Sequence, residues 1–192
     1  DNKAGRAHLI KDEIDFINKR KDYYDMVVRL LADGDIPLRV THNDTKLNNV
    51  LFDKETKKGL CVVDLDTVMP GSALYDFGDS IRFGANTAAE DEKDLSKVSL
   101  SLEYFKAYVD GYLEAAGESL TETEIELLPF AAKLLTFECG MRFLEDYLNG
   151  DTYFKIHRPD HNIDRARTQF KLVSDMETKT EQMNAIVAKY FG

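Results

Sequence analysis

One segment of the chain couples a polar loop to a pair of short apolar runs. Residues 41–52 read THNDTKLNNVLF, and residues 60–66 read LCVVDLD. The apolar runs at 50–52 and 60–63 have the length of strands. The stretch between them is polar and ends in glycine, which is typical of a surface turn. The sequence therefore predicts a β-hairpin fed by a short loop, with residues 38–40 as a strand that enters the loop at His42.

Helical patterns dominate the rest of the chain. Helices are predicted over residues 8–32, 75–83, 94–116, 121–148 and 164–190. Thr121 and Glu124 form a capping-box pattern, and the helix after them is apolar on nearly every side between residues 127 and 139, as is typical of a central helix. Residues 69–71 are expected to break the chain, and residues 149–160 to form a loop. The predicted fold class is α+β and mainly α-helical, with one hairpin among helices.

The net charge limits the partners that we expect, and the cysteines bear on the cellular location. The net charge is −10 and the longest basic cluster is residues 19–21, which argues against nucleic acid. No apolar run approaches 18 residues and no signal peptide is recognisable, so no membrane partner is expected. Cys61 and Cys139 each lie in an apolar run. We expect both to be buried free thiols, which favours a reducing cytoplasmic location.

The spacing of three polar residues in this segment is typical of a catalytic site. Asn49 follows Asp44 by five residues, and Asp64 follows it by twenty. This spacing resembles that of kinase-like phosphotransferases, in which the first Asp takes the proton of the acceptor and the other two residues bind Mg²⁺. Asp44 is therefore the candidate base, and Asn49 and Asp64 are the candidate Mg²⁺ ligands. The alternative for each is a turn or capping role.

Neighbouring residues are assigned to the same chemistry. Lys46 is either a contact for the transferred phosphate or a solvated loop lysine. His42 is expected to support the loop backbone as a neutral imidazole. Asp66 would share the strand face of Asp64 and support the metal or bind a second one, or it caps a loop. Asp76 begins the sequence Asp-Phe-Gly, but its helical context predicts that it accepts hydrogen bonds from loop amides instead of binding metal.

Beyond these residues, the chain resembles the C-terminal lobe of the aminoglycoside phosphotransferase/choline kinase superfamily, whose members have a two-lobed, protein-kinase-like fold. It is most similar to N-acetylhexosamine 1-kinases. The similar segments cover nearly all of the chain and are residues 42–51, 63–71, 75–82, 142–148, 150–153 and 165–169. The resemblance implies Mg²⁺ and ATP as cofactors, and the anomeric hydroxyl of N-acetylglucosamine or N-acetylgalactosamine as acceptor.

The resemblance also implies that Arg142 and Tyr153 contact the sugar. From the residue types alone, Arg142 could instead pair with Glu138 or Glu145 along its helix, and Tyr153 could be ordinary loop packing. Two other functions stay open. One is phosphorylation of a different small acceptor, such as choline, homoserine or an aminoglycoside. The other is a non-catalytic fragment or binding module.

The N-terminal lobe of that superfamily has no counterpart that we recognise here. Residues 1–40 are too helical for it, and they lack a Gly-rich loop and a strand lysine with its glutamate partner. The first residue is Asp1, not Met. We therefore expect residues 1–192 to be a C-terminal lobe, a fragment of a two-lobed protein. Such a lobe would expose an apolar face to the missing lobe and show little turnover alone.

Overall fold

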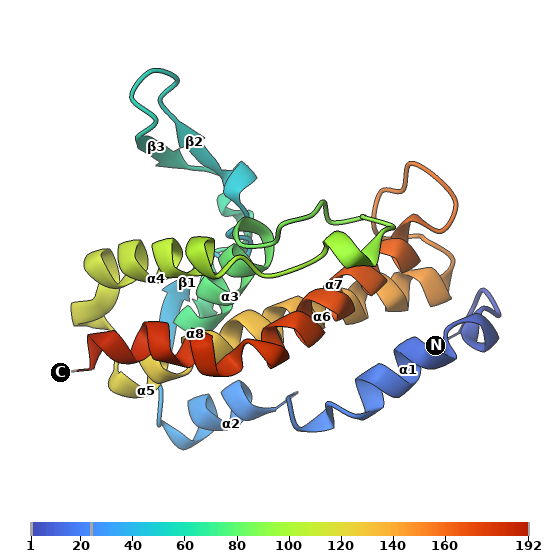
Figure 1. Cartoon of the computed structure of the whole chain (residues 1–192), viewed down its shortest axis with the longest axis horizontal. Helices are drawn as coiled ribbons and strands as arrows, with labels where there is room; N and C mark the ends of the chain where they lie inside the picture. Colours follow the sequence, from blue (N-terminus) through green and yellow to red (C-terminus); the bar gives the residue numbers. More distant parts are fainter. Residues whose placement is uncertain (1, 24, 192) are drawn as a thin grey trace.

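The molecule is a helical body from which a β-hairpin projects (Figure 1). The computed structural model describes residues 2–23 and 25–191 of the chain. Tyr24, which belongs to the first predicted helix, lies outside the described residues. The predicted fold class, mainly α-helical with a small β component, is confirmed.

The body is built around one long helix, α6 (Leu128–Asn149), which packs against α3 (Ala73–Gly84) and α7 (His161–Thr178). Two glycines permit these close approaches. A Cβ on Gly78 of α3 would lie 2.4 Å from the carbonyl oxygen of Ala131, and a Cβ on Gly140 of α6 would lie 2.6 Å from the ring of Phe170. The central position predicted for the apolar helix is confirmed, because most of the residues of α6 are buried.

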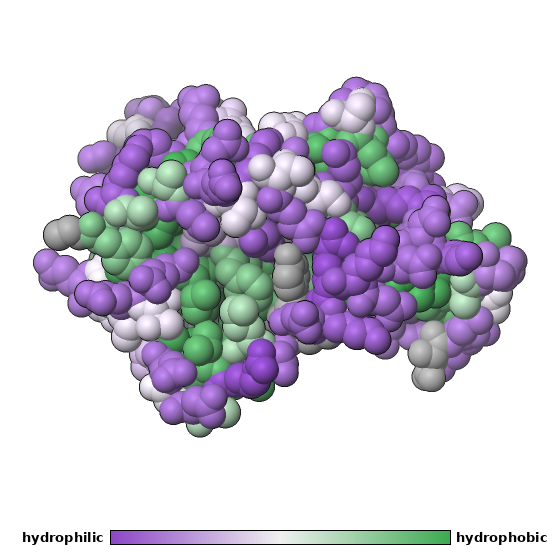
Figure 2. Space-filling view, turned by 60° about the horizontal axis from the view of Figure 1, so that its bottom comes forward, coloured by the Kyte–Doolittle hydropathy of each residue, from purple (hydrophilic) through white to green (hydrophobic). Residues whose placement is uncertain are grey.

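The other elements surround this core. The remaining helices are α1 (Lys11–Asn18), α2 (Met26–Asp33), α4 (Leu102–Ala116), α5 (Glu122–Glu126) and α8 (Thr180–Val187). Short 3-10 turns are η1 (Ala7–Leu9), η2 (Lys21–Tyr23), η3 (Leu47–Asn49), η4 (Leu65–Thr67), η5 (Leu95–Lys97), η6 (Gly117–Ser119) and η7 (Ala188–Tyr190). A larger apolar core includes Phe77 and Phe105, and a smaller one includes Phe137 and Phe143. Hydrophilic residues cover most of the face in Figure 2, with hydrophobic side chains in patches between them.

Two small antiparallel sheets make up the β region (residues 38–71). Strand β2 (Val50–Phe52) pairs with β3 (Gly59–Val62), which confirms the predicted hairpin. Strand β1 (Arg39–Thr41) pairs with β4 (Met69–Gly71). The expectation that residues 69–71 break the chain is wrong. Pro70 fits the strand because a two-stranded sheet consists only of edge strands, where a missing N–H is tolerated.

Several predicted helices are divided or shortened. In the described part of the first predicted helix lie the separate helices α1 and α2, the second of which ends at Asp33. Helix α4 begins only after Ser101, whose hydroxyl accepts the N–H of Tyr104. The predicted capping box of Thr121 and Glu124 is confirmed, but it opens the short α5. Helix α6 restarts at Leu128 because Pro129 has no N–H to continue the ladder. The last predicted helix is likewise divided into α7 and α8.

Cysteine burial differs from the expectation. Cys61 is exposed on β3, so its predicted burial is wrong, because the projecting hairpin leaves both of its faces uncovered. Cys139, a residue of α6, has a largely enclosed side chain, and burial raises the pKa of its thiol to about 12.

Several exposed apolar side chains lie along the β region. Val40 is 82% exposed, Leu38 67% and Leu60 66%. Within residues 2–23 and 25–191, no helix has the length and apolar character needed to cross a membrane.

Candidate active site

The loop after β1 is held by a carboxylate of the helical body. Asp76, in the first turn of α3, accepts the N–H of His42 at 2.8 Å and the N–H of Asn43 at 2.7 Å. Asn43 has a positive φ of 63°, a conformation that non-glycine residues rarely adopt. The two hydrogen bonds stabilise this turn, and they are the loop contacts that the sequence predicted for Asp76.

The loop is also tied to the residue that precedes Asp64. The N–H of Asp44 donates to Nδ1 of His42 at 3.3 Å, and Nε2 of His42 lies 2.9 Å from the carbonyl oxygen of Val63. Nε2 therefore carries the proton and the ring is a neutral imidazole. The N–H of Val63 donates to the carbonyl of Asn49 at 2.9 Å. Val63 is thus fixed on both sides, which brings Asp64 to the end of the hairpin where Asn49 lies.

The carboxylate of Asp44 has two hydrogen-bond donors nearby. Its Oδ2 accepts a hydrogen bond from Lys46 Nζ at 2.7 Å and another from Asn49 Nδ2 at 2.8 Å. Burial alone would raise the pKa of this carboxyl, but the hydrogen bonds from Lys46 and Asn49, with the nearby Lys46 charge, lower the pKa below its ordinary value. Asp44 is therefore ionised at neutral pH. The structure brings together three of the predicted residues, Asp44, Lys46 and Asn49.

Asp64 and Asp66 follow β3 and are both exposed. Asp64 has left-handed backbone angles (φ 65°, ψ 55°), and Asp66 lies in the first turn of η4. The expectation that they share a strand face is wrong, because β3 ends at Val62 and the alternation of a strand does not continue. The amide nitrogen of Asn49 faces Asp44, which leaves its Oδ1 on the opposite branch of the amide. Asn49 and Asp64 thus lie at one end of the hairpin, where Asn49 is buried and Asp64 is exposed.

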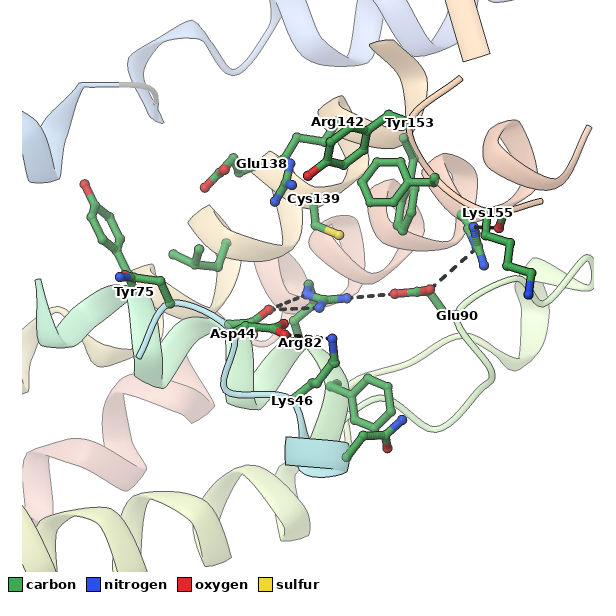
Figure 3. A pocket seen from close by; sticks show the side chains of 18 of the residues that line it. Asp44, Lys46, Tyr75, Arg82, Glu90, Glu138, Cys139, Arg142, Tyr153 and Lys155 are labelled. Carbon is green, nitrogen blue, oxygen red and sulfur yellow. Dashed lines mark hydrogen bonds and ion pairs between the residues drawn. The ribbon is translucent and has the colours of Figure 1, made fainter. Parts of the chain in front are cut away.

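A cleft of about 820 Å³ opens beside this loop. Asp44 and Lys46 line one side, and Arg142 and Tyr153 line the other (Figure 3). The guanidinium carbon of Arg142 lies 5.9 Å from the ring centre of Tyr153 and 5.6 Å from that of Phe154. These two rings pack edge to face at 4.8 Å. The structure therefore places the two predicted sugar contacts side by side, with Phe154 as a partner that the sequence reasoning missed.

A buried charge network forms another part of the cleft. Arg82 of α3 is 8% exposed, and its guanidinium lies 2.8 Å from Asp79 and 3.0 Å from Glu90. Burial alone would lower the pKa of Arg82, but the charges of the adjacent groups raise it. The i, i+3 spacing of Asp79 and Arg82 is a signal that could have been found in the sequence. Glu90 lies in an irregular segment, and no local pattern links it to Arg82.

The charges that line the cleft are nearly balanced. Five lining residues are cationic and four are anionic, in a chain whose net charge is −10. They are Lys46, Arg82, Arg142, Lys155 and Arg165, and Asp44, Asp79, Glu90 and Glu138. The cleft is thus suited to a polar ligand without strong positive charge.

One comparison with known proteins bears on this site. The sequence model of the phosphotransferase enzyme family matches residues 2–122. The matched range is more than half of the chain and contains Asp44, Asn49, Asp64 and Asp76, together with the hairpin. The chain therefore belongs to the phosphotransferase enzyme family.

Proposed function

We propose that this protein transfers the γ-phosphoryl group of ATP to the anomeric hydroxyl of an N-acetylhexosamine. Membership of the phosphotransferase enzyme family supports the transfer chemistry. The observation that carries the proposal is the cleft, which has Asp44 and Lys46 on one side and Arg142 and Tyr153 on the other. A sugar held against Arg142 and Tyr153 would present a hydroxyl to Asp44.

Asp44 is the base in this proposal. Phosphoryl transfer passes through a loose transition state, so the enzyme contributes mainly position and charge. An ionised carboxylate can orient the acceptor hydroxyl and take its proton late in the reaction. The lowered pKa of Asp44 suits this role, because it keeps the carboxylate ionised at neutral pH. Lys46, 2.7 Å from that carboxylate, supplies a positive charge for the transferred phosphoryl group.

Asn49 and Asp64 would hold Mg²⁺. The ion prefers oxygen donors, and the amide oxygen of Asn49 and the carboxylate of Asp64 fit that preference. Two protein ligands are enough, because Mg²⁺ commonly keeps waters and binds substrate phosphates as well. Bound there with ATP, it would neutralise phosphate charge. Asp66, two residues further along, would support Asp64 or bind a second ion.

The acceptor assignment rests on the far side of the cleft. Tyr153 is 73% exposed and can stack on the apolar face of a sugar ring, while Arg142 can donate hydrogen bonds to sugar oxygens. Choline and aminoglycosides are cationic, and a site for them would need a clear excess of acidic groups. The near balance of charge in this cleft favours a neutral sugar.

The β region supports a second part of the proposal. Its exposed apolar side chains, such as Val40 and Leu60, have the character of a surface that another domain covers. We propose that residues 1–192 form the C-terminal lobe of a two-lobed kinase. Residues 1–192 alone would then turn over slowly, since most of the nucleotide contacts would come from the other lobe.

The test is ³¹P NMR on the full-length product of the gene, incubated with ATP and Mg²⁺. The acceptors are N-acetylglucosamine, N-acetylgalactosamine, choline, homoserine and an aminoglycoside, each in a separate sample. We expect an anomeric sugar phosphate with at least one N-acetylhexosamine and no product with the others. Product from only another acceptor would refute the sugar assignment. Intact ATP in every sample would refute the phosphotransfer, and rapid turnover by residues 1–192 alone would refute the two-lobe proposal.

A further inference from the structure

The segment that carries Tyr153 folds around one buried carboxylate. Asp146 of α6 is 5% exposed. Its Oδ1 accepts the N–H of Thr152 and the N–H of Tyr153, both at 2.8 Å, and its Oδ2 accepts the N–H of Phe154 at 2.9 Å. Three consecutive backbone N–H groups thus converge on one anion, an arrangement in which each hydrogen bond is charge-assisted.

Helix α7 and the N-terminal segment complete this arrangement. The buried side chain of Asn162 donates to Asp146 Oδ2 at 2.8 Å and to Asp151 Oδ1 at 2.9 Å. Arg6 donates to the carbonyl of Tyr147 at 2.9 Å and forms an ion pair with Asp151 at 2.5 Å. The chain between α6 and Thr152 turns back through two residues with positive φ, Gly150 at 98° and Asp151 at 61°. The turn returns the backbone to the Asp146 carboxylate.

Packing of the tyrosine ring does little to fix this segment. Tyr153 is 73% exposed, so its position depends mainly on its backbone. Asp146 lies four residues after Arg142 on α6, which puts both side chains on one face of the helix, one turn apart. A single helix therefore carries both Arg142 and the carboxylate that orients the rings beside it. We call Arg142, Tyr153 and Phe154 the acceptor platform.

We propose that Asp146 is a positioning residue for acceptor binding, acting through the backbone of residues 152–154. The identity of the acceptor rests on the proposed function, but the positioning role does not. Asp146 would hold the acceptor platform in the geometry that presents a hydroxyl to Asp44. The binding of ATP would be unaffected, since the loop that carries Asp44 is fixed separately by Asp76 and His42.

The test is Asp146→Asn in the full-length protein. An amide keeps the size of the side chain but replaces one acceptor oxygen by a donor. Either the two donors at Oδ1 or the two at Oδ2 then face an NH₂ group. Loss of a group that orients a metal-binding residue typically costs about 10- to 100-fold in affinity or activity. We expect a loss of that size in kcat/KM for the acceptor, mostly as a higher acceptor KM, with the KM for ATP unchanged.

The matched control is Asp175→Asn. Asp175 on α7 also accepts a backbone N–H, that of Leu100 at 2.7 Å, and pairs with Lys179 at 2.7 Å. It is not among the described residues that line the cleft. Both variants should lower the Tm, and only Asp146→Asn should raise the acceptor KM. If the acceptor KM of both variants equals that of the wild type, Asp146 has only a structural role and the proposal is overturned.

Two further measurements separate the possible failures. Hydrogen exchange needs no substrate, and Asp146→Asn should speed exchange at residues 152–154 whereas Asp175→Asn should not. If exchange at residues 152–154 is unchanged in Asp146→Asn, the positioning proposal is overturned, whether or not the wild type makes a sugar phosphate. If the wild type makes no sugar phosphate, that result alone refutes only the proposed function.

The double variant Asp146→Asn/Tyr153→Ala should have an acceptor kcat/KM little lower than that of Tyr153→Ala. Losses that multiply would contradict an action through Tyr153. Should Asp146→Asn not fold, Asn162→Ala removes one donor and should change the acceptor KM in the same direction.

Discussion

Different interactions stabilise the β region and the helical body of this protein. Large apolar side chains of the β region, such as Val40 and Leu60, lie mostly in solvent, whereas Phe105 in the body is fully buried. The loop within the β region is instead fixed by hydrogen bonds, chiefly those that Asp76 accepts and those of the His42 ring. Packing therefore sets the stability of the body, and polar contacts set the geometry of the candidate site.

Carboxylates on two helices of the body hold the two loops that line the candidate site. Asp76 of α3 accepts two N–H groups of the loop that contains Asp44, and Asp146 of α6 accepts three N–H groups of the segment that contains Tyr153. Each carboxylate belongs to a helix of the body and accepts backbone N–H groups of a loop that lines the cleft. Substitutions can therefore separate stability from activity.

The largest effect on stability should come from the apolar core. Phe105→Ala removes a buried ring that packs edge to face on Phe77, and we expect a loss of about 3–5 kcal/mol in the free energy of unfolding. In residues 1–192 alone, Val40→Ser in the β region is the control, with an expected change within about 0.5 kcal/mol. Urea unfolding measures both. A cost for Val40→Ser equal to that of Phe105→Ala would contradict the comparison.

The next largest effect should be on activity. Asp76→Asn leaves an NH₂ group facing the N–H of either His42 or Asn43. The displaced loop should lower kcat by about 100-fold. The free energy of unfolding should fall by only about 1–3 kcal/mol. Steady-state kinetics with urea unfolding tests this, and the idea that Asp76 orients the loop fails if kcat is unchanged.

Two glycine substitutions sharpen the role of packing within the body. A Cβ on Gly78 would meet the backbone of Ala131, so Gly78→Ala should destabilise the protein by about 1–3 kcal/mol. Gly111 of α4 has no atom within 4 Å of the added Cβ, so Gly111→Ala should stabilise it by about 0.5–1 kcal/mol. Thermal unfolding should show shifts of opposite sign. Shifts of the same sign would mean that the α3–α6 contact is looser than described.

The smallest predicted effect concerns the pKa of Asp44. Lys46→Met removes a hydrogen bond and a charge that lower this pKa, so the pKa should rise toward or above its ordinary value of 3.8. Because the ionised form is the base, the variant should lose activity at a higher pH than the wild type as the pH falls. A ¹³C NMR titration of the Asp44 carboxyl gives the pKa directly. An unchanged or lower value in Lys46→Met would show that the ion pair is not formed in solution.

The features that the sequence predicted well are carried by neighbouring residues. The hairpin, the Thr121 capping box and the contacts of Asp76 each follow from a short pattern with one favoured geometry. Helix boundaries were less accurate, since periodicity across residues 121–148 hides the break that Pro129 makes. The apolar run around Cys61 predicts a buried thiol, but the thiol is exposed because the hairpin projects into solvent.

Polar contacts between residues far apart in the sequence could not be predicted, because no local pattern marks them. Glu90 reaches Arg82 from an irregular segment, and the donors to Asp146 come from a loop with no periodic pattern. Such partners are selected by the tertiary fold, which one sequence does not display.

The most direct test of the account compares Asp44→Asn with the wild type in the full-length protein. Sugar 1-phosphate formation from N-acetylhexosamine, ATP and Mg²⁺ is followed by ³¹P NMR, with Asp53→Asn in the hairpin turn as the matched control. We predict that Asp53→Asn retains the wild-type rate and that Asp44→Asn loses about 10²- to 10⁴-fold, the usual contribution of a positioned base. Equal rates for Asp44→Asn and the wild type would contradict the assignment of Asp44 as the base.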